Sequence, residues 1–335
     1  MTSPQLLTDF TYGHIHASSE RFARPNDLTP EHYDLIIAAA SWDARSSVIT
    51  NLPITADHCV LIRPPNTPTN AGRIENERYL ERWLRVSCLE VVPLEYEDDL
   101  EAALAGLVVR VRTLLQRPRS RVLIDMSACA RFLSLGILWL IQHDGVAGTI
   151  DVLYAEGDHT SALDDGSYTD SEKDGWSLES IPGYEGDWYP TRPTSVLISA
   201  GFDASRVSQI LELNDVSRIG ILFGIPGVLD TFEGEALARN KAWIDAIGPH
   251  EKLNQPAGDA VAVWRELVQW GRYDNIRALL GGPKAHSLGI ALASITTGRF
   301  GLLYLRPEVR RPRSIKPLGP VWRYRLRDRS ALAGL

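Results

Sequence analysis

The run Leu35-Ile36-Ile37-Ala38-Ala39-Ala40 leads directly into Ser41-Trp42-Asp43-Ala44-Arg45-Ser46, and this passage decides the fold. An uninterrupted apolar run of this length is typical of a strand buried on both faces, as in a parallel sheet. The polar residues after it belong to a turn at the carboxyl end of that strand. The passage therefore predicts the first strand of an α/β unit, followed by a loop at the edge where such sheets bind ligands.

Outward from this strand, short apolar runs alternate with segments of helical periodicity. The predicted strands are 59–62, 89–92, 122–124 and 150–154, and the predicted helices are 74–85, 100–116 and 132–142. Strands that alternate with helices at this spacing indicate βαβ connections and a parallel sheet. Residues 33–155 are therefore predicted to form a first Rossmann-like unit.

The alternation stops at residues 156–193 and then resumes. That interval is acidic, rich in Gly, Ser and Tyr, and contains Trp176 and Trp188, so we predict a linker or a lid. Residues 194–306 again read as strands at 196–198, 219–223, 276–280 and 300–305, with helices at 204–213, 233–247, 259–271 and 287–295. The fold class is therefore α/β: two tandem Rossmann-like units with mainly parallel sheets, joined by a long loop segment.

The two ends of the chain differ from these units. Residues 1–32 are polar and aperiodic and are predicted to form an N-terminal arm. Residues 307–335 form a basic tail in which Trp322, Tyr324 and Leu326 alternate with arginines. That alternation predicts an edge strand with a basic outer face.

The two halves repeat each other at strand-to-helix turns. Ser41-Trp42-Asp43-Ala44-Arg45 corresponds to Gly201-Phe202-Asp203-Ala204 with Arg206, and Ser134-Leu135-Gly136-Ile137 corresponds to Ser287-Leu288-Gly289-Ile290. The two matches occur in the same order and at nearly the same spacing. We interpret them as a duplication that gives each unit two polar loops at the carboxyl ends of its strands.

The loop after the first strand of each unit allows two interpretations. Asp43 and Asp203 can cap the following helix, or they can accept hydrogen bonds from ribose hydroxyls or a base. Arg45 and Arg206 suit a phosphate, since a guanidinium binds oxyanions with two parallel hydrogen bonds. Trp42 and Phe202 can stack on a base or fill the core.

The loop before the repeated Ser-Leu-Gly-Ile segment of each unit is the second candidate. Gly281-Gly282-Pro283-Lys284 lets the backbone approach an anion before a helix begins, and His286 adds a polar group. The spacing matches neither a Walker loop nor a dinucleotide-binding fingerprint. In the first unit the corresponding loop offers Asp125, Ser127 and Arg131 without a G-x-S-x-G elbow.

Composition limits the classes of function. The 335 residues carry a net charge of −7, which argues against nucleic-acid binding over the whole surface, and only the basic C-terminal tail suits that role. The three cysteines show no C-x-x-C spacing, and no stretch predicts a membrane span, a metal site or a cofactor fingerprint. We expect a cytoplasmic protein that needs no cofactor.

At these loops the sequence resembles the CRISPR-associated Rossmann-fold (CARF) sensors, and the tandem arrangement resembles their fused form, the SAVED domain of bacterial antiphage signalling. Gly281-Gly282-Pro283-Lys284 is similar to the G-G-T-K-P loop of that family, with Pro and Lys exchanged and the Thr missing. Asp125-Met126-Ser127 with Arg131 resembles the alternative loop of related units. The resemblance implies binding of a cyclic oligonucleotide messenger, which some relatives also cleave without a metal.

Three hypotheses follow from these features. The first is a sensor for a phosphorylated or nucleotide ligand that signals to a separate protein partner in antiviral defence. The second is an enzyme acting on a nucleotide or phosphoester through Asp43, Asp125, Asp203 and Lys284. The third is a scaffold subunit whose units no longer bind a ligand. We favour a binding protein over an enzyme.

Overall fold

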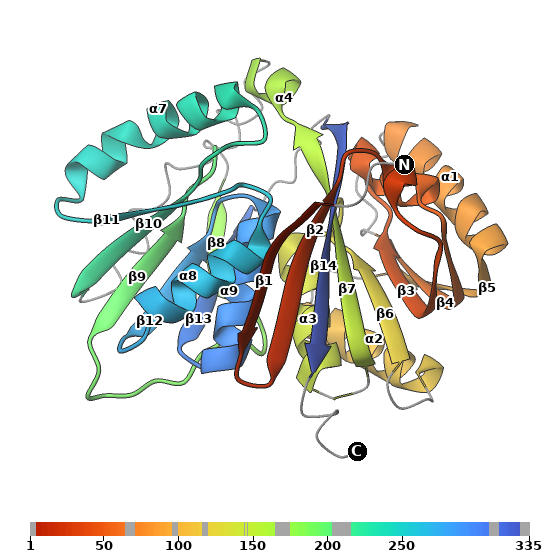
Figure 1. The fold of residues 1–335 in the computed structure, drawn as a ribbon, viewed down its shortest axis with the longest axis horizontal. Helices are drawn as coiled ribbons and strands as arrows, with labels where there is room; N and C mark the ends of the chain where they lie inside the picture. Colours follow the sequence, from red (N-terminus) through yellow and green to blue (C-terminus); the bar gives the residue numbers. More distant parts are fainter. Residues whose placement is uncertain are drawn as a thin grey trace. The chain divides into compact units, whose positions relative to one another are not determined.

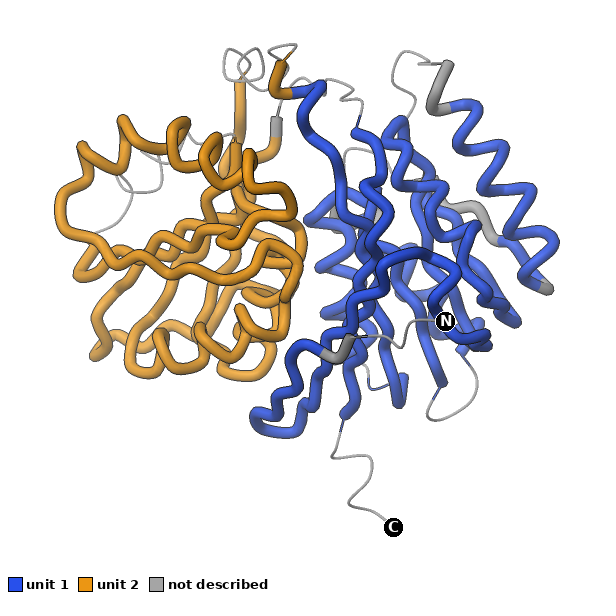
Figure 2. The backbone as a smooth tube through the Cα atoms, turned by 45° about the horizontal axis from the view of Figure 1, so that its top comes forward, with its two compact units in different colours: residues 1–162, 312–335 blue, residues 163–311 orange. Residues whose placement is uncertain are grey.

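The computed structural model describes residues 5–63, 71–95, 100–115, 120–143, 145, 147–164, 175–202, 216–307 and 315–328. The chain divides into two compact units (Figure 2). Unit 1 comprises Met1–Ala162 together with Pro312–Leu335, and unit 2 comprises Leu163–Arg311. The C-terminal segment thus returns to the unit in which the chain begins. Among the described helices, none combines the length and the apolar character needed to span a bilayer.

Unit 1 contains a mixed sheet of eight described strands in the order β1-β2-β14-β7-β6-β3-β4-β5 (Figure 1). Its parallel part consists of β3 (Glu31–Ala39), β4 (Ile54–Arg63), β5 (Cys88–Glu95), β6 (Ser120–Asp125) and β7 (Ala147–Asp158). Renumbered along the chain, these strands follow the Rossmann order 3-2-1-4-5. This confirms the α/β class and the predicted position of the first strand.

The terminal segments of unit 1 differ from the sequence prediction. Residues 5–22 are not a separate arm, because they form the antiparallel hairpin β1 (Gln5–Tyr12) and β2 (Ile15–Phe22) within the sheet. The basic tail contains β14 (Lys316–Asp328), but β14 lies between β2 and β7 rather than at an edge (Figure 1). The alternation in the sequence identified a strand but could not identify its neighbours.

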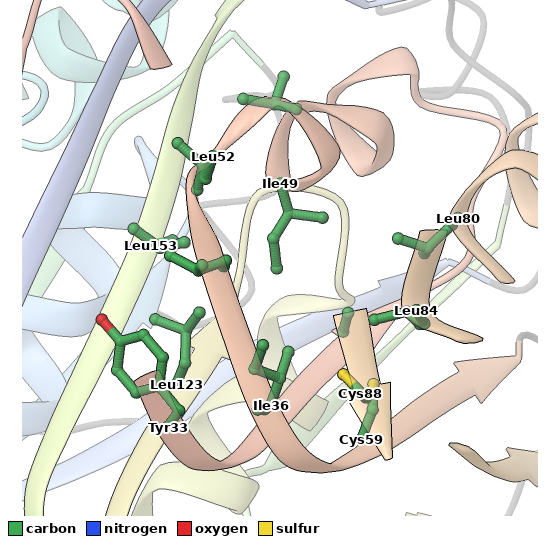
Figure 3. Packing of buried hydrophobic residues seen from close by; sticks show 14 of the residues in the cluster. Tyr33, Ile36, Ile49, Leu52, Cys59, Leu80, Leu84, Cys88, Leu123 and Leu153 are labelled. Carbon is green, nitrogen blue, oxygen red and sulfur yellow. The ribbon is translucent and has the colours of Figure 1, made fainter. Parts of the chain in front are cut away.

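Both faces of the unit 1 sheet are covered. Ile36 and Ala38 of β3 belong to one apolar cluster, while Leu35 and Ile37 are equally buried and point the other way. The cluster includes side chains from the 3-10 helix η2 (Ala44–Asn51) and from α1 (Ala71–Ser87) (Figure 3). Elsewhere in the unit, α2 (Leu100–Leu114) packs against α3 (Arg131–His143).

Unit 2 contains a sheet of six described strands in the order β11-β10-β9-β12-β13-β8 (Figure 1). The strands are β8 (Trp176–Ser180), β9 (Thr194–Ser199), β10 (Arg218–Gly224), β11 (Glu251–Gln255), β12 (Asn275–Leu280) and β13 (Phe300–Pro307). All but β8 are parallel. Residues 176–180 of the predicted linker or lid are therefore an edge strand of this sheet.

The described helices of unit 2 agree with the sequence prediction, except that α7 and α9 each begin three residues earlier than predicted. The described helices are α7 (Asp230–Ala246), α8 (Ala260–Trp270) and α9 (Lys284–Thr297). The predicted helix 204–213 lies outside the described residues. Helix α9 begins at Lys284 rather than Ser287, so Lys284 and His286 belong to its first turn and not to the preceding loop.

The two units share one topology. The parallel strands of unit 2 also follow the order 3-2-1-4-5, and in each unit an antiparallel strand flanks the fifth parallel strand. This agreement supports the duplication inferred from the repeated turns. In each sheet the strand order reverses beside the first parallel strand, which is β3 in unit 1 and β9 in unit 2.

Candidate functional site

The predicted loops lie beside the point in each sheet where the strand order reverses. Beside β3 and β6 in unit 1, and beside β9 and β12 in unit 2, the connections diverge to opposite sides of the sheet. Ligands of open α/β sheets bind at the carboxyl ends of such strands. The structure therefore brings together the two predicted loops of each unit at one position per sheet.

In unit 1, Asp43 and Arg45 bind each other. The carboxylate of Asp43 accepts hydrogen bonds from Arg45 Nη2 at 2.6 Å and Nε at 3.0 Å, and also from the Arg45 backbone N–H at 3.0 Å. Both residues are buried, and Asp43 caps η2. The capping interpretation of Asp43 thus holds, and the Arg45 guanidinium already has its anionic partner within the chain.

The rest of this loop is closely packed. A Cβ atom on Gly157 would lie 2.9 Å from Arg45 Nη1 and 2.7 Å from the side chain of Ile315. Ser41 is buried, and its hydroxyl accepts a hydrogen bond from the Asp43 backbone N–H at 3.2 Å. The interior of this loop is therefore filled by the protein's own groups, while Trp42 is half-buried.

The second loop of unit 1 is also structural. Asp125 accepts a hydrogen bond from the Ser127 backbone N–H at 2.9 Å, and Ser127 Oγ accepts one from the Ala155 N–H at 2.9 Å. Asp125 and Ser127 are both buried. These contacts join the end of β6 to β7. Arg131 is half-buried and forms the first residue of α3.

In unit 2 the glycines allow two backbones to touch. A Cβ on Gly201 would lie 2.2 Å from the carbonyl oxygen of Gly281, and one on Gly282 would lie 2.2 Å from Ser199 Oγ. A real Cβ atom does not approach a backbone oxygen so closely, so only glycine fits at position 201. These glycines allow contact between the loops after β9 and β12, whereas the sequence predicted an approach of the backbone to an anion.

The first turn of α9 is the part of the site whose electrostatics most favour a bound anion. Pro283 occupies the N-cap position and makes no side-chain hydrogen bond to the first turn of the helix. Lys284 is half-buried at the first helical position. The partial positive charge of a helix N-terminus and the Lys284 ammonium both favour a negatively charged group.

Four predicted site residues of unit 2 remain, of which the structure describes His286 and Phe202. His286 is fully buried, and its Nε2 lies 3.1 Å from the carbonyl oxygen of Pro256, which gives it a structural role. Phe202 makes an edge-on contact with Phe232, with ring centroids 5.6 Å apart. Asp203 and Arg206 lie outside the described residues.

Sequence reasoning missed a charged network on the sheet of unit 1. Glu31 of β3 pairs with Arg121 of β6 and with Arg323 and Arg325 of β14, and Asp151 of β7 pairs with Arg325 at 2.8 Å. The alternation of arginines with apolar residues in the tail does indicate an amphipathic strand. The alternation predicts a solvent-facing row of arginines, because local sequence does not encode which strands pair with β14.

A cavity of about 400 Å³ lies at the opposite, amino end of the unit 1 strands. It is lined by Asp34, Asp57, His58, Glu90, Arg110, Thr113, Leu114 and Ser120. Within the described residues, no group of three His, Cys, Asp or Glu side chains is placed to hold a metal ion. The cavity is separate from the predicted loops, which follow the carboxyl ends of the strands.

No family model and no curated protein match this chain. Among solved structures, the chain is similar to one described as the "Adenylation, ketoreductase, and pseudo Asub multidomain structure of a keto acid-selecting NRPS module", at 12% identity and a TM-score of 0.22. The match covers 85% of this chain and 31% of that chain, so the chain spans about a third of its length. At that TM-score the likeness carries no argument about this protein.

Proposed function

We propose that this protein binds a small phosphorylated or nucleotide-like ligand at the switch point of unit 2. The observation that carries this proposal is the first turn of α9, which has no side-chain cap and begins with Lys284, beside the contacting loops after β9 and β12. A phosphate group there would accept hydrogen bonds from backbone N–H groups and would be attracted to Lys284. In unit 1 the guanidinium of Arg45 is bound to Asp43, while Arg131 holds the first position of α3, as Lys284 does in α9.

The geometry favours binding over catalysis. A general acid or base has to reach the reacting group, but Asp43 caps η2 and Asp125 closes a turn, and both are buried. Two of the acids in the enzyme hypothesis thus have structural roles. We therefore propose a ligand sensor that binds at unit 2, while Asp43 and Asp125 serve the structure of unit 1.

The class of ligand follows from the resemblance to the CARF and SAVED sensors. We propose a nucleotide messenger, with cyclic oligonucleotides as the first probes, and a signalling role in antiviral defence through a separate protein. The combination of one lysine and a helix N-terminus suits a phosphodiester, which presents one negative charge per linkage.

The test is a calorimetric titration of the full chain with a panel of linear mononucleotides and cyclic di-, tri- and tetranucleotides. We expect at least one of these ligands to bind the native chain. The Lys284→Ala variant should bind it about 10-fold more weakly, because one charge-assisted contact is worth about 1.4 kcal/mol or more.

Lys252→Ala is the matched control, since Lys252 is exposed on β11 and the variant loses the same charge. This control should bind like the native chain. Alanine at the first helical position keeps α9 stable, so both variants should melt at the native temperature. Absence of binding across the panel, or equal affinity of the Lys284→Ala variant, would refute the proposal.

A further inference from the structure

We infer that unit 2 carries a second binding surface, for single-stranded nucleic acid, at the amino end of its parallel strands. This Arg–aromatic surface consists of Trp188, Tyr189, Arg192, Arg272, Tyr273, Arg277 and Arg299. Its segments precede or open β9, β12 and β13, whereas the loops of the proposed ligand site follow the opposite ends of β9 and β12. The inference is therefore independent of the proposed function.

Hydrogen bonds between backbone and side chains hold this surface together. The Asn275 side chain accepts from the Tyr189 N–H at 3.0 Å and donates to the carbonyl oxygens of Tyr189 at 2.8 Å and Arg192 at 3.2 Å. Arg299 donates to the carbonyl oxygen of Arg272. The segment before β9 is thereby fixed beside the start of β12, and the start of β13 beside the turn after α8.

The aromatic rings are stacked on arginines but remain accessible. The guanidinium carbon lies 4.1 Å from the ring centroid in the Arg192–Tyr189 pair, 5.1 Å in Arg277–Trp188 and 5.4 Å in Arg272–Tyr273. Trp188 is 51% exposed, Tyr189 41% and Tyr273 69%. An arginine therefore orients each ring while much of the ring stays open to solvent, and an open ring can stack on a nucleobase.

The surface has an excess of positive charge. Within the described part of the chain, Arg192, Arg272, Arg277 and Arg299 form no ion pair with a carboxylate, whereas nearby Arg218 is neutralised by Glu251 at 2.6 Å and Asp274 at 3.3 Å. Two exposed acids, Glu185 and Asp187, offset part of this charge. The remaining excess favours an anionic partner despite the net charge of −7 for the whole chain.

Single-stranded nucleic acid meets both requirements of this surface. Its unpaired bases offer planar faces to the rings, and its phosphates accept hydrogen bonds from the guanidinium groups. A duplex hides its bases in the stack, so it could use only the arginines. An acidic peptide would likewise satisfy the charges but leave the rings without planar partners.

Fluorescence anisotropy with labelled single-stranded oligonucleotides of DNA and RNA tests the inference on the full chain. Trp188→Ala and Tyr273→Ala should each weaken binding at least about 5-fold, since base–aromatic stacking is worth about 1–3 kcal/mol per base. The double variant Arg272→Ala/Arg277→Ala should weaken binding and reduce the slope of log affinity against log salt by about 1.4, the value for two lost phosphate contacts.

Matched controls separate this surface from the rest of the molecule. Tyr79→Ala removes a ring that is 50% exposed on α1 of unit 1 and should leave the affinity unchanged. Lys252→Ala removes an exposed charge on β11 outside both sites and should also bind the oligonucleotide normally. Circular dichroism and thermal melting confirm that each variant is folded.

Three results would overturn the inference. The first is a native chain that does not bind single strands at low salt. The second is equal affinity for duplex and single strand, or affinities unaffected by the Trp188 and Tyr273 substitutions. The third is displacement of the oligonucleotide by polyglutamate at equal charge concentration, which would indicate an acidic protein partner instead.

Discussion

At the scale of single residues, burial decides whether a charged side chain is a ligand group or part of the scaffold. Asp43 and Arg45 read equally well as a cap and as a ligand-binding pair in the sequence. In the fold they satisfy each other at 2.6 Å in a buried setting, where an unpaired charge would be costly. The sequence thus singles out Asp43 and Arg45, but it does not show that the two side chains pair with each other or that the loop is buried.

Glu31 gives a prediction about pH. Burial raises the pKa of its carboxyl, but Arg323, Arg121 and Arg325 outweigh burial and hold the pKa at about 2, below its ordinary value of 4.5. Because the folded-state pKa is depressed, the stabilisation is complete above pH 4.5 and is lost as the pH falls towards 2.

Glu31→Gln should therefore lower the free energy of unfolding by about 2 kcal/mol at neutral pH, after allowance for solvent screening. It should also flatten the loss of stability between pH 4.5 and 2. Urea denaturation across this pH range measures both effects. Glu235→Gln is the control, because it breaks a surface ion pair with Arg239 in which the Glu235 side chain is 38% exposed. This variant should change the free energy of unfolding only by tenths of a kcal/mol. Equal effects of the two variants would contradict the prediction.

Gly201 gives a second prediction at this scale. Gly201→Ala places a Cβ 2.2 Å from the Gly281 carbonyl oxygen, so the two loops must separate. We expect a loss of about 1–3 kcal/mol in unfolding free energy, the usual cost of overpacking. In Gly234→Ala, within α7, the new methyl meets no atom within 4 Å, and the variant should be stabilised by about 0.5–1 kcal/mol. Thermal melting of both variants measures the difference, and a stabilised Gly201→Ala variant would show that the loops are not in contact.

At the scale of elements, periodicity located the long segments and missed the short or unusually paired ones. The buried runs that became β3 and β12, and the amphipathic stretch that became α8, carry their own signal of continuous or periodic apolar residues. Strand β11, Glu-Lys-Leu-Asn-Gln, buries only Leu253 and has no apolar pattern to detect. It forms because parallel pairing with β10 satisfies its backbone.

The partner of a strand is also an element-scale property that local sequence does not encode. The alternation of Trp322, Tyr324 and Leu326 with arginines predicted an amphipathic strand, and β14 is one. Its two faces are both used inside the sheet, since Trp322 donates to buried Glu156 at 2.6 Å while Arg323 and Arg325 pair with acids of other strands of the sheet. Those acids lie far away in sequence, on β3 and β7.

At the scale of the whole molecule, unit 1 is discontinuous and unit 2 is continuous. Strand β14 separates the β1–β2 hairpin from β7, so a chain that ends at Ala162 lacks a strand in the interior of its sheet. All described strands of unit 2 come from residues 176–307. We therefore expect residues 163–311 to fold when expressed alone, and residues 1–162 to fail.

The register of β14 against β7 suggests a shortened chain in which unit 1 folds without unit 2. Lys316 of β14 pairs directly with Asp158 of β7 in antiparallel register. A short Asn-Gly turn that replaces residues 159–315 would join these strands into a hairpin and complete the eight-stranded order. This shortened chain should melt cooperatively and give dispersed amide signals by NMR, whereas residues 1–162 should give neither. A cooperative melt of residues 1–162 alone, at the temperature of the shortened chain, would show that β14 is dispensable and that the duplicated core folds without its returning strand.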